Sequence, residues 1–147
     1  MDRKRIFLRL LRISLGWLLL WGFFDKLFGL GFSTCRDVKT GIIDYFCEGA
    51  WINGGSPTYG FLKFGVHGPL AEFFHGLASV AVVDWLFMVG LLLIGLAFVF
   101  NFSLRLAGYS GALMMLLMYL GLIPPEHNIL IDEHIIYLFA FLFFAES

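Results

Sequence analysis

The chain has 147 residues, of which 60% are hydrophobic and 14% are charged. A soluble domain is nearer half apolar and a quarter charged, so this composition indicates a bilayer protein, with one domain over residues 1–147. The net charge of −1 excludes a surface for binding polyanions, and no nucleic-acid-binding motif is visible in the sequence.

Basic residues are concentrated at the start of the chain, where residues 1–12 hold five of the ten. The apolar run that follows has no small-x-small cleavage site, which favours a retained transmembrane helix over residues 6–28 against a secretory signal peptide. The basic cluster predicts a cytoplasmic N-terminus. Asp25 and Lys26 interrupt the far end of this span, either as an ordinary polar helix end or as a functional pair.

Residues 29–77 contain no clear span, and we expect them to form a structured extracytoplasmic loop. The loop holds both cysteines, Cys35 and Cys47. Two cysteines that face an oxidising compartment predict a disulfide. A redox-active pair and two unpaired thiols are the alternatives, but no C-x-x-C motif is present to lower a thiol pKa.

Two further segments of the loop have recognisable patterns. Residues 53–58 (NGGSPT) must turn sharply, and glycines in series can also present backbone N–H groups to an anion, although a plain turn is the simpler interpretation. Residues 68–77 predict a short helix with Pro69 at its first position and a one-sided apolar stripe. Such a helix would lie at the membrane interface or over the bundle, with His75 largely off the stripe.

The most apolar stretch, residues 78–102, has one charged residue, Asp84, in 25 positions. A helix of this length exceeds the ~30 Å hydrocarbon core, which predicts the second span. An acid inside a span is costly and requires a partner. We expect an ion pair between Asp84 and Lys26; a functional role for Asp84 is the alternative, and both can hold.

Residues 106–123 predict a third span, whose first half is rich in small residues at four-residue spacing. Residues 124–125 (Pro-Pro) end it. The following segment, residues 126–134, is rich in acids and histidines, but His127 and His134 do not have a recognised zinc spacing, so no metal is predicted. A short fourth span over residues 133–147 completes the expected fold, an all-α four-helix transmembrane bundle with both ends in the cytoplasm.

Four stretches, in order along the chain, resemble the DoxX/DoxD group of small membrane proteins, in particular the DoxD-type large subunit of thiosulfate:quinone oxidoreductases. They are residues 12–32 (RISLGWLLLWGFFDKLFGLGF), 51–62 (WINGGSPTYGFL), 82–97 (VVDWLFMVGLLLIGLA) and 113–128 with 132–137 (LMMLLMYLGLIPPEHN, DEHIIY). The resemblance implies a four-helix membrane bundle. For some members it also implies electron transfer from reduced sulfur to a membrane quinone, with a partner subunit. The ending departs from the family pattern, in which a tail follows a complete fourth helix.

This resemblance leads us to expect a quinone-linked oxidoreductase subunit that acts on a reduced sulfur compound such as thiosulfate, with quinone as a substrate. Asp84 or His75 is the expected catalytic group, which would handle the protons of the quinone. The sequence has no haem, flavin or iron–sulfur motif, so the electrons require a route through the cysteines or a cofactor on a partner. The candidate substrate-binding residues are Lys26, Asn53, Gly54, Gly55, Ser56 and Trp85.

The alternative function is a non-catalytic membrane anchor or assembly subunit of a larger complex. The small residues of the third span and the shortness of the fourth both suit a chain that packs against a neighbour, either a partner subunit or a second copy. Under both hypotheses the lipid bilayer is the main environment of the chain.

Overall fold

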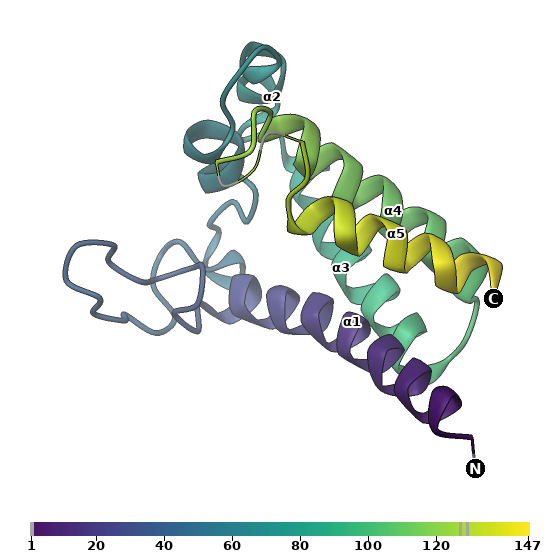
Figure 1. Cartoon of the computed structure of the whole chain (residues 1–147). Helices are drawn as coiled ribbons and strands as arrows, with labels where there is room; N and C mark the ends of the chain where they lie inside the picture. Colours follow the sequence, from purple (N-terminus) through teal and green to yellow (C-terminus); the bar gives the residue numbers. More distant parts are fainter. Residues whose placement is uncertain (1, 127, 129) are drawn as a thin grey trace.

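The computed structural model describes residues 2–126, 128 and 130–147, and this part of the chain is helical (Figure 1). Within these ranges no strand forms; one antiparallel bridge joins Arg36 and Ile43. The elements in chain order are α1 (Arg3–Phe28), the 3-10 turn η1 (Trp51–Asn53), the π-helical turn η2 (Phe61–Gly65), α2 (Ala71–Leu77), α3 (Ala81–Phe100), α4 (Leu104–Gly121) and α5 (Glu133–Glu146).

Three helices, α1, α3 and α4, are long and apolar enough to cross a membrane. They match the first three predicted spans and identify the chain as a membrane protein. The predicted fourth span at residues 133–147 forms α5, which has 14 residues. A helix of that length extends about 21 Å, less than the ~30 Å hydrocarbon core. The short helix predicted over residues 68–77 forms as α2 over seven residues, but it begins at Ala71, so Pro69 precedes the helix and does not occupy its first position.

Helices α1 and α3 pack closely because glycines remove side chains from their contact. A methyl group added at Gly16 would lie 2.8 Å from the carbonyl oxygen of Gly95, and one added at Gly95 would lie 2.7 Å from the side chain of Leu20. The guanidinium of Arg12 donates to the carbonyl oxygens of Phe98 and Val99 at the C-terminal end of α3. This bond satisfies carbonyls that have no partner within the helix.

Helices α4 and α5 pack through the small residues of α4. A methyl group at Gly108 would lie 2.7 Å from Ala145, and one at Gly111 would lie 2.8 Å from the ring of Phe141. The small-residue face that the sequence suggested for a neighbouring chain is therefore covered by α5 of the same chain. Phe98 of α3 contacts Phe141 edge-on, with ring centroids 5.0 Å apart, which joins α5 to the core.

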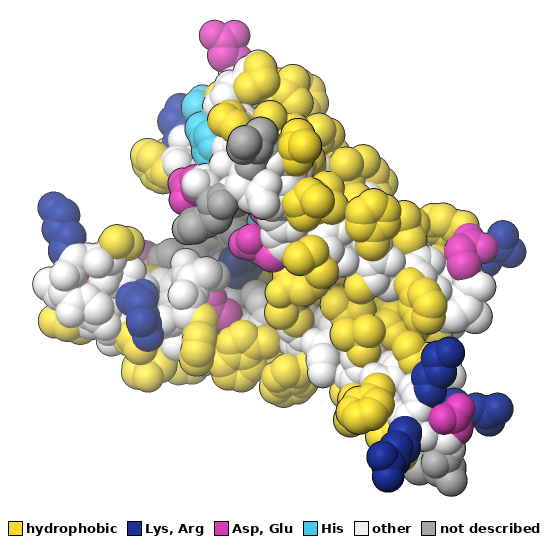
Figure 2. Space-filling model, viewed as in Figure 1, with side chains coloured by type: hydrophobic (Ala, Val, Ile, Leu, Met, Phe, Trp, Pro, Cys, Tyr) yellow, Lys and Arg dark blue, Asp and Glu magenta, His cyan; other side chains and the backbone are white. Residues whose placement is uncertain are grey.

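The two ends of the helical part differ in charge. Both termini and the α3–α4 turn lie at one end, and the loop between α1 and α3 lies at the other (Figure 1). Figure 2 shows Lys and Arg side chains gathered around the N-terminal end of α1, while hydrophobic side chains cover the sides of the helices. Phe7, Leu86 and Leu106 are each more than two-thirds exposed, as expected for side chains that contact lipid.

Candidate functional site

Asp84 lies in the first turn of α3 and is 7% exposed. Its Oδ1 accepts hydrogen bonds from Ser56 Oγ at 2.8 Å, Thr58 Oγ1 at 2.6 Å and the backbone N–H of Thr58 at 3.2 Å. Ser56 and Thr58, both in the turn at residues 53–58, thus supply hydrogen-bond donors to the buried acid of the second span. A buried carboxylate that accepts several donors needs no cation beside it.

The ion pair predicted between Lys26 and Asp84 is not formed. Lys26 donates from Nζ to Ser33 Oγ at 2.8 Å. Within the described ranges the one ion pair joins His134 to Asp132. The physical reason for the difference is that the loop folds back and brings uncharged donors to Asp84, while Lys26 lies beside Asp25 and Ser33.

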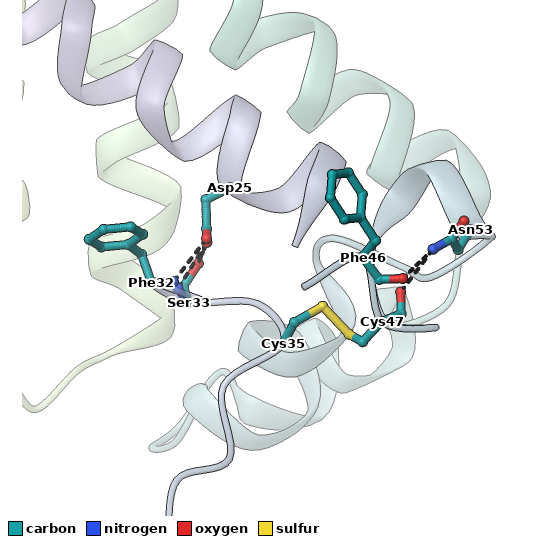
Figure 3. Close-up of a disulfide and its surroundings, with 7 residues drawn as sticks. All are labelled: Asp25, Phe32, Ser33, Cys35, Phe46, Cys47 and Asn53. Atoms are coloured by element: carbon teal, nitrogen blue, oxygen red, sulfur yellow. Dashed lines mark hydrogen bonds between the residues drawn. A yellow bond between two sulfur atoms is a disulfide. The ribbon is translucent and has the colours of Figure 1, made fainter. Parts of the chain in front are cut away.

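Asp25 anchors the start of the loop on the end of α1. It is 1% exposed and accepts from the backbone N–H of Phe32 at 2.9 Å, the N–H of Ser33 at 2.8 Å and Ser33 Oγ at 2.8 Å (Figure 3). Sequence reasoning left open whether this residue was an ordinary helix end. Its contacts are structural, and the signal for them was the serine that follows the Gly-Leu-Gly break.

Cys35 and Cys47 form the predicted disulfide (Figure 3). It packs on Gly29, which ends α1 in the left-handed conformation, and a methyl group at Gly29 would lie 2.3 Å from Cys35 Sγ. The carbonyl oxygen of Cys47 accepts from the N–H of Ala50 at 3.0 Å and from Asn53 Nδ2 at 3.2 Å. The disulfide therefore supports the turn that carries η1.

The turn and the start of α3 form an open-sided cavity of about 430 Å³. Its lining residues are Trp51, Gly54, Gly55, Ser56, Ser79, Ala81, Asp84 and Trp85. The rings of Trp51 and Trp85 meet edge-to-face with centroids 4.8 Å apart. Gly55 permits a close approach of two loop segments, since a methyl group there would lie 2.2 Å from the carbonyl oxygen of Gly49.

The cavity brings together five of the predicted site residues and leaves out three. Gly54, Gly55, Ser56, Asp84 and Trp85 line it. The three that lie elsewhere are Asn53, Lys26 and His75. The side-chain amide of Asn53 donates to the carbonyl oxygens of Phe46 and Cys47, so this residue holds the turn together. His75 lies on α2, and its Nε2 is buried with no hydrogen-bond partner among the described residues.

Trp51 is a cavity residue that the sequence analysis did not select as a ligand contact. It lies only two residues before Asn53, but the sequence places 33 residues between it and Trp85. Nothing local to either tryptophan indicates that their rings meet. The packing of η1 against the end of α1 brings Trp51 next to the first turn of α3.

The geometry of Asp84 separates the roles of its two oxygens. Oδ1 accepts all three donors, and Oδ2 receives no hydrogen bond from the described part of the chain. A proton carried by this carboxyl group would therefore reside on Oδ2. The site combines two aromatic rings with a carboxyl group, one oxygen of which accepts no hydrogen bond from the described residues.

The acid- and histidine-rich segment before α5 gives a second group of polar side chains. Ligand atoms of Asp132, Glu133 and His134 lie within 4.8 Å of one another. Asp132 caps α5 by accepting from the N–H groups of His134 and Ile135, and its Oδ2 lies 2.8 Å from His134 Nδ1. His127 lies outside the described residues. Asp132 therefore caps α5, and the expectation that no metal binds stays a prediction.

Comparison with known proteins gave no match to a family model, to a curated protein or to a solved structure. The similarity to the DoxX/DoxD group therefore remains a prediction from the sequence. The candidate site therefore rests on the cavity lined by Trp51, Asp84 and Trp85.

Proposed function

We propose that this chain is the membrane subunit of a quinone-linked oxidoreductase and that the cavity beside Asp84 receives the quinone head group. The observation that carries the proposal is that Asp84, whose Oδ2 has no hydrogen-bond partner among the described residues, lines a cavity together with two indoles. Supporting it, residues 51–62 and 82–97, which carry the DoxX/DoxD resemblance, both contribute to this cavity.

The chemistry of the cavity suits a quinone. The ring is planar and apolar, so it can pack against Trp51 and Trp85. Its carbonyl oxygens accept hydrogen bonds, and its reduction to quinol takes up two electrons and two protons. Asp84, in its protonated form, supplies one proton from Oδ2 while Ser56 and Thr58 hold Oδ1. Water supplies the second proton and reprotonates Asp84. Since no histidine lines the cavity among the described residues, the proposal gives this role to Asp84 and not to His75.

The electrons come from outside this cavity. We assign the oxidation of a reduced sulfur compound such as thiosulfate to a partner subunit or to a site formed with one, because the chain itself has no haem, flavin or iron–sulfur motif. Lys26 lies outside the cavity lining, so an anionic donor would not meet the quinone there. This separation also avoids bringing an anion next to the carboxylate of Asp84.

The proposed topology has the N-terminus in the cytoplasm and the loop at residues 29–77 outside. It is supported by the Lys and Arg residues at the N-terminal end of α1 and by Arg105 at the start of α4, at the same end of the helices. In this arrangement α5 is the fourth helix of the bundle. Of the two features that supported the alternative function as a non-catalytic anchor, the small residues of α4 are covered by α5, while the shortness of α5 still suits that function.

The test measures binding of a short-tailed quinone to the protein in lipid nanodiscs. Binding is detected by the quenching of tryptophan fluorescence. We expect Trp85→Ala to weaken binding about 3- to 10-fold, since it removes one aromatic wall. Trp17→Phe, far from the cavity on α1, is the matched control and should bind as the wild type does. Equal affinities for wild type and Trp85→Ala would contradict the proposal.

The role of Asp84 is tested separately by turnover. With a donor system that reduces quinone through the complex, Asp84→Asn should bind quinone within a few-fold of wild type and lose most of its turnover. An asparagine can accept from Thr58 but carries no exchangeable acid proton. Equal turnover of the two proteins would remove Asp84 from the mechanism.

A further inference from the structure

One wall of the cavity lies on the lipid-facing side of α3. Trp85 is 60% exposed, and four neighbouring apolar side chains are exposed on the same helix. These are Val82, Leu86, Val89 and Leu93. Their spacing of three or four residues places them on one face of α3. Exposed apolar side chains on a helix that crosses a membrane contact lipid, so this stripe faces the acyl chains.

Trp85 belongs to both the stripe and the cavity. Its ring contacts Trp51 of η1 on the cavity side, and the exposed remainder lies beside Val82 and Leu86. Ser79 and Ala81, at the start of α3, are exposed and also line the cavity. Asp84, one residue before Trp85, is buried and points to the loop turn. The exposed residues Ser79, Ala81 and Trp85 form the mouth of the cavity, and Asp84 forms its polar end. The two lie on adjacent faces of the start of α3.

The first turn of a membrane-spanning helix lies at the boundary between head groups and acyl chains, where tryptophan is enriched. A cavity that opens there is reached by molecules dissolved in the bilayer. We infer that the cavity takes its ligand laterally from the membrane and that the ligand is a single amphiphile. Its polar head lies at Asp84, and its apolar tail lies along the stripe of Val82, Leu86, Val89 and Leu93.

The tail contact and the lateral route depend on the exposure of α3. Only the identification of the head group as a quinone rests on the proposed function. The tail stripe lies on the outside of the helix and needs no movement of the loop to be reached. The length of the ligand's tail should therefore change its affinity for the protein by contacts with α3. The chemistry of its head group should change the affinity by contacts with Asp84.

The first experiment locates the mouth of the cavity without any ligand. A variant that keeps only Trp85, made by changing Trp17, Trp21 and Trp51 to Phe, is placed in nanodiscs whose lipids carry bromine near the head-group end of the acyl chain. We expect strong quenching of Trp85 fluorescence by these lipids and weak quenching by aqueous iodide. Strong quenching by iodide and none by the brominated lipid would show that the cavity opens to water and would overturn the inference.

The second experiment tests the tail stripe with matched variants. Leu86→Ala removes tail contact on α3, and Leu113→Ala removes a similarly exposed leucine on α4. With a decyl-tailed quinone, at equal mole fraction in the membrane, Leu86→Ala should bind about 3- to 10-fold more weakly, and Leu113→Ala should match the wild type. A tail-less quinone should bind both variants equally. An equal loss for the two quinones would contradict the tail placement.

The two proposals fail in different ways. If neither quinone binds while brominated lipid quenches Trp85, the quinone function is wrong and the lateral opening stands. If Trp85→Ala weakens quinone binding, but Leu86→Ala binds each quinone as the wild type does and iodide reaches Trp85, the quinone function stands and the lateral route is wrong.

Discussion

Thr58 holds Asp84 with two donors on a single oxygen: its hydroxyl lies 2.6 Å and its backbone nitrogen 3.2 Å from Asp84 Oδ1. The two residues are 26 positions apart and both are buried. The contact joins the loop to the first turn of α3 and leaves the other carboxyl oxygen without a described partner. It therefore links the stability of the loop to the chemistry proposed for the cavity.

Replacing Thr58 with Val should destabilise the protein by about 1–3 kcal/mol, because a buried hydrogen bond to a carboxylate is lost while the shape is kept. Thr58→Ser keeps the hydroxyl donor and should cost less than Thr58→Val. The measurement is the free energy of unfolding in a detergent denaturation series. If the two variants are equally stable, the hydroxyl does not support Asp84.

Changing Asp25 to Asn should detach the start of the loop from α1. The amide oxygen can still accept from one of the N–H groups of Phe32 and Ser33, but the amide NH2 then faces the other, so about 2–4 kcal/mol of local stability should be lost. Hydrogen exchange of residues 29–35 would report it as faster exchange. Asp44→Asn, an exposed acid in the same loop, is the control and should leave exchange unchanged.

Reduction of the disulfide should loosen the turn that carries Trp51. Loss of the cross-link between Cys35 and Cys47 is expected to destabilise the loop by about 3 kcal/mol in the chain-entropy model. The direct readout is faster proteolysis of the loop and a change in Trp51 fluorescence after adding a reductant. The Cys35→Ser/Cys47→Ser double variant should behave like the reduced protein and show no response to reductant; a response would indicate another cause.

His67 should make the contact between its loop and the α4–α5 connection pH-dependent. Its Nε2 lies 3.0 Å from the carbonyl oxygen of Pro124, and its Nδ1 lies 3.2 Å from that of Gly65. Both carbonyls accept, so the ring can donate to both only when it is protonated. These two bonds and the charge of Glu126 raise the pKa of His67 above its ordinary value of 6.5.

A pKa that is higher in the folded state than in the unfolded state gives stability that is complete below the unfolded value. That stability is lost as the pH rises through the folded pKa. The wild type should therefore be more stable than His67→Gln below pH 6.5, and the difference should shrink at higher pH. Thermal unfolding of both proteins across this range is the measurement. A constant difference would show that protonation of His67 has no part in the contact.

The packing of α4 on α5 should not tolerate a side chain at Gly108. A methyl group there meets Ala145 and the backbone of Phe141, so Gly108→Ala should cost about 1–3 kcal/mol. The control is Gly22→Ala in α1, where a methyl group meets nothing within 4 Å. That change should be neutral or stabilising by up to about 1 kcal/mol, since alanine favours a helix. Equal effects on thermal stability would contradict the packing.

The local features of the chain were predictable. Long apolar runs predicted the helices α1, α3 and α4, and the placement of both cysteines in one loop predicted the disulfide. The turn at residues 53–58 and Asp84 were also recognised as possible parts of one site. The helices and the disulfide depend on the hydrophobicity of single segments or on residues in one loop, and the shared site followed from the expected topology, which places the turn and Asp84 at the same end of the helices.

The partner of Asp84 was not predictable in the same way. Charge alone favoured Lys26, because the expected topology placed this cation near Asp84. In the structure Ser56 and Thr58 donate hydrogen bonds to Asp84 instead. Small residues on α4 were equally suited to a second chain or to α5, and α5 covers them. In both cases several partners satisfy the same local pattern.

The sequence by itself determined that this is an all-helical membrane protein with a disulfide-linked loop, because hydrophobic run length and cysteine placement act locally. Only the tertiary structure decided that Trp51, Trp85 and Asp84 share one cavity. That outcome depends on how a loop of about 50 residues folds back on two helices. Lys26, Ser56 and Thr58 all carry donors that a carboxylate can accept, so the position of the backbone, more than the identity of the side chains, selects among them.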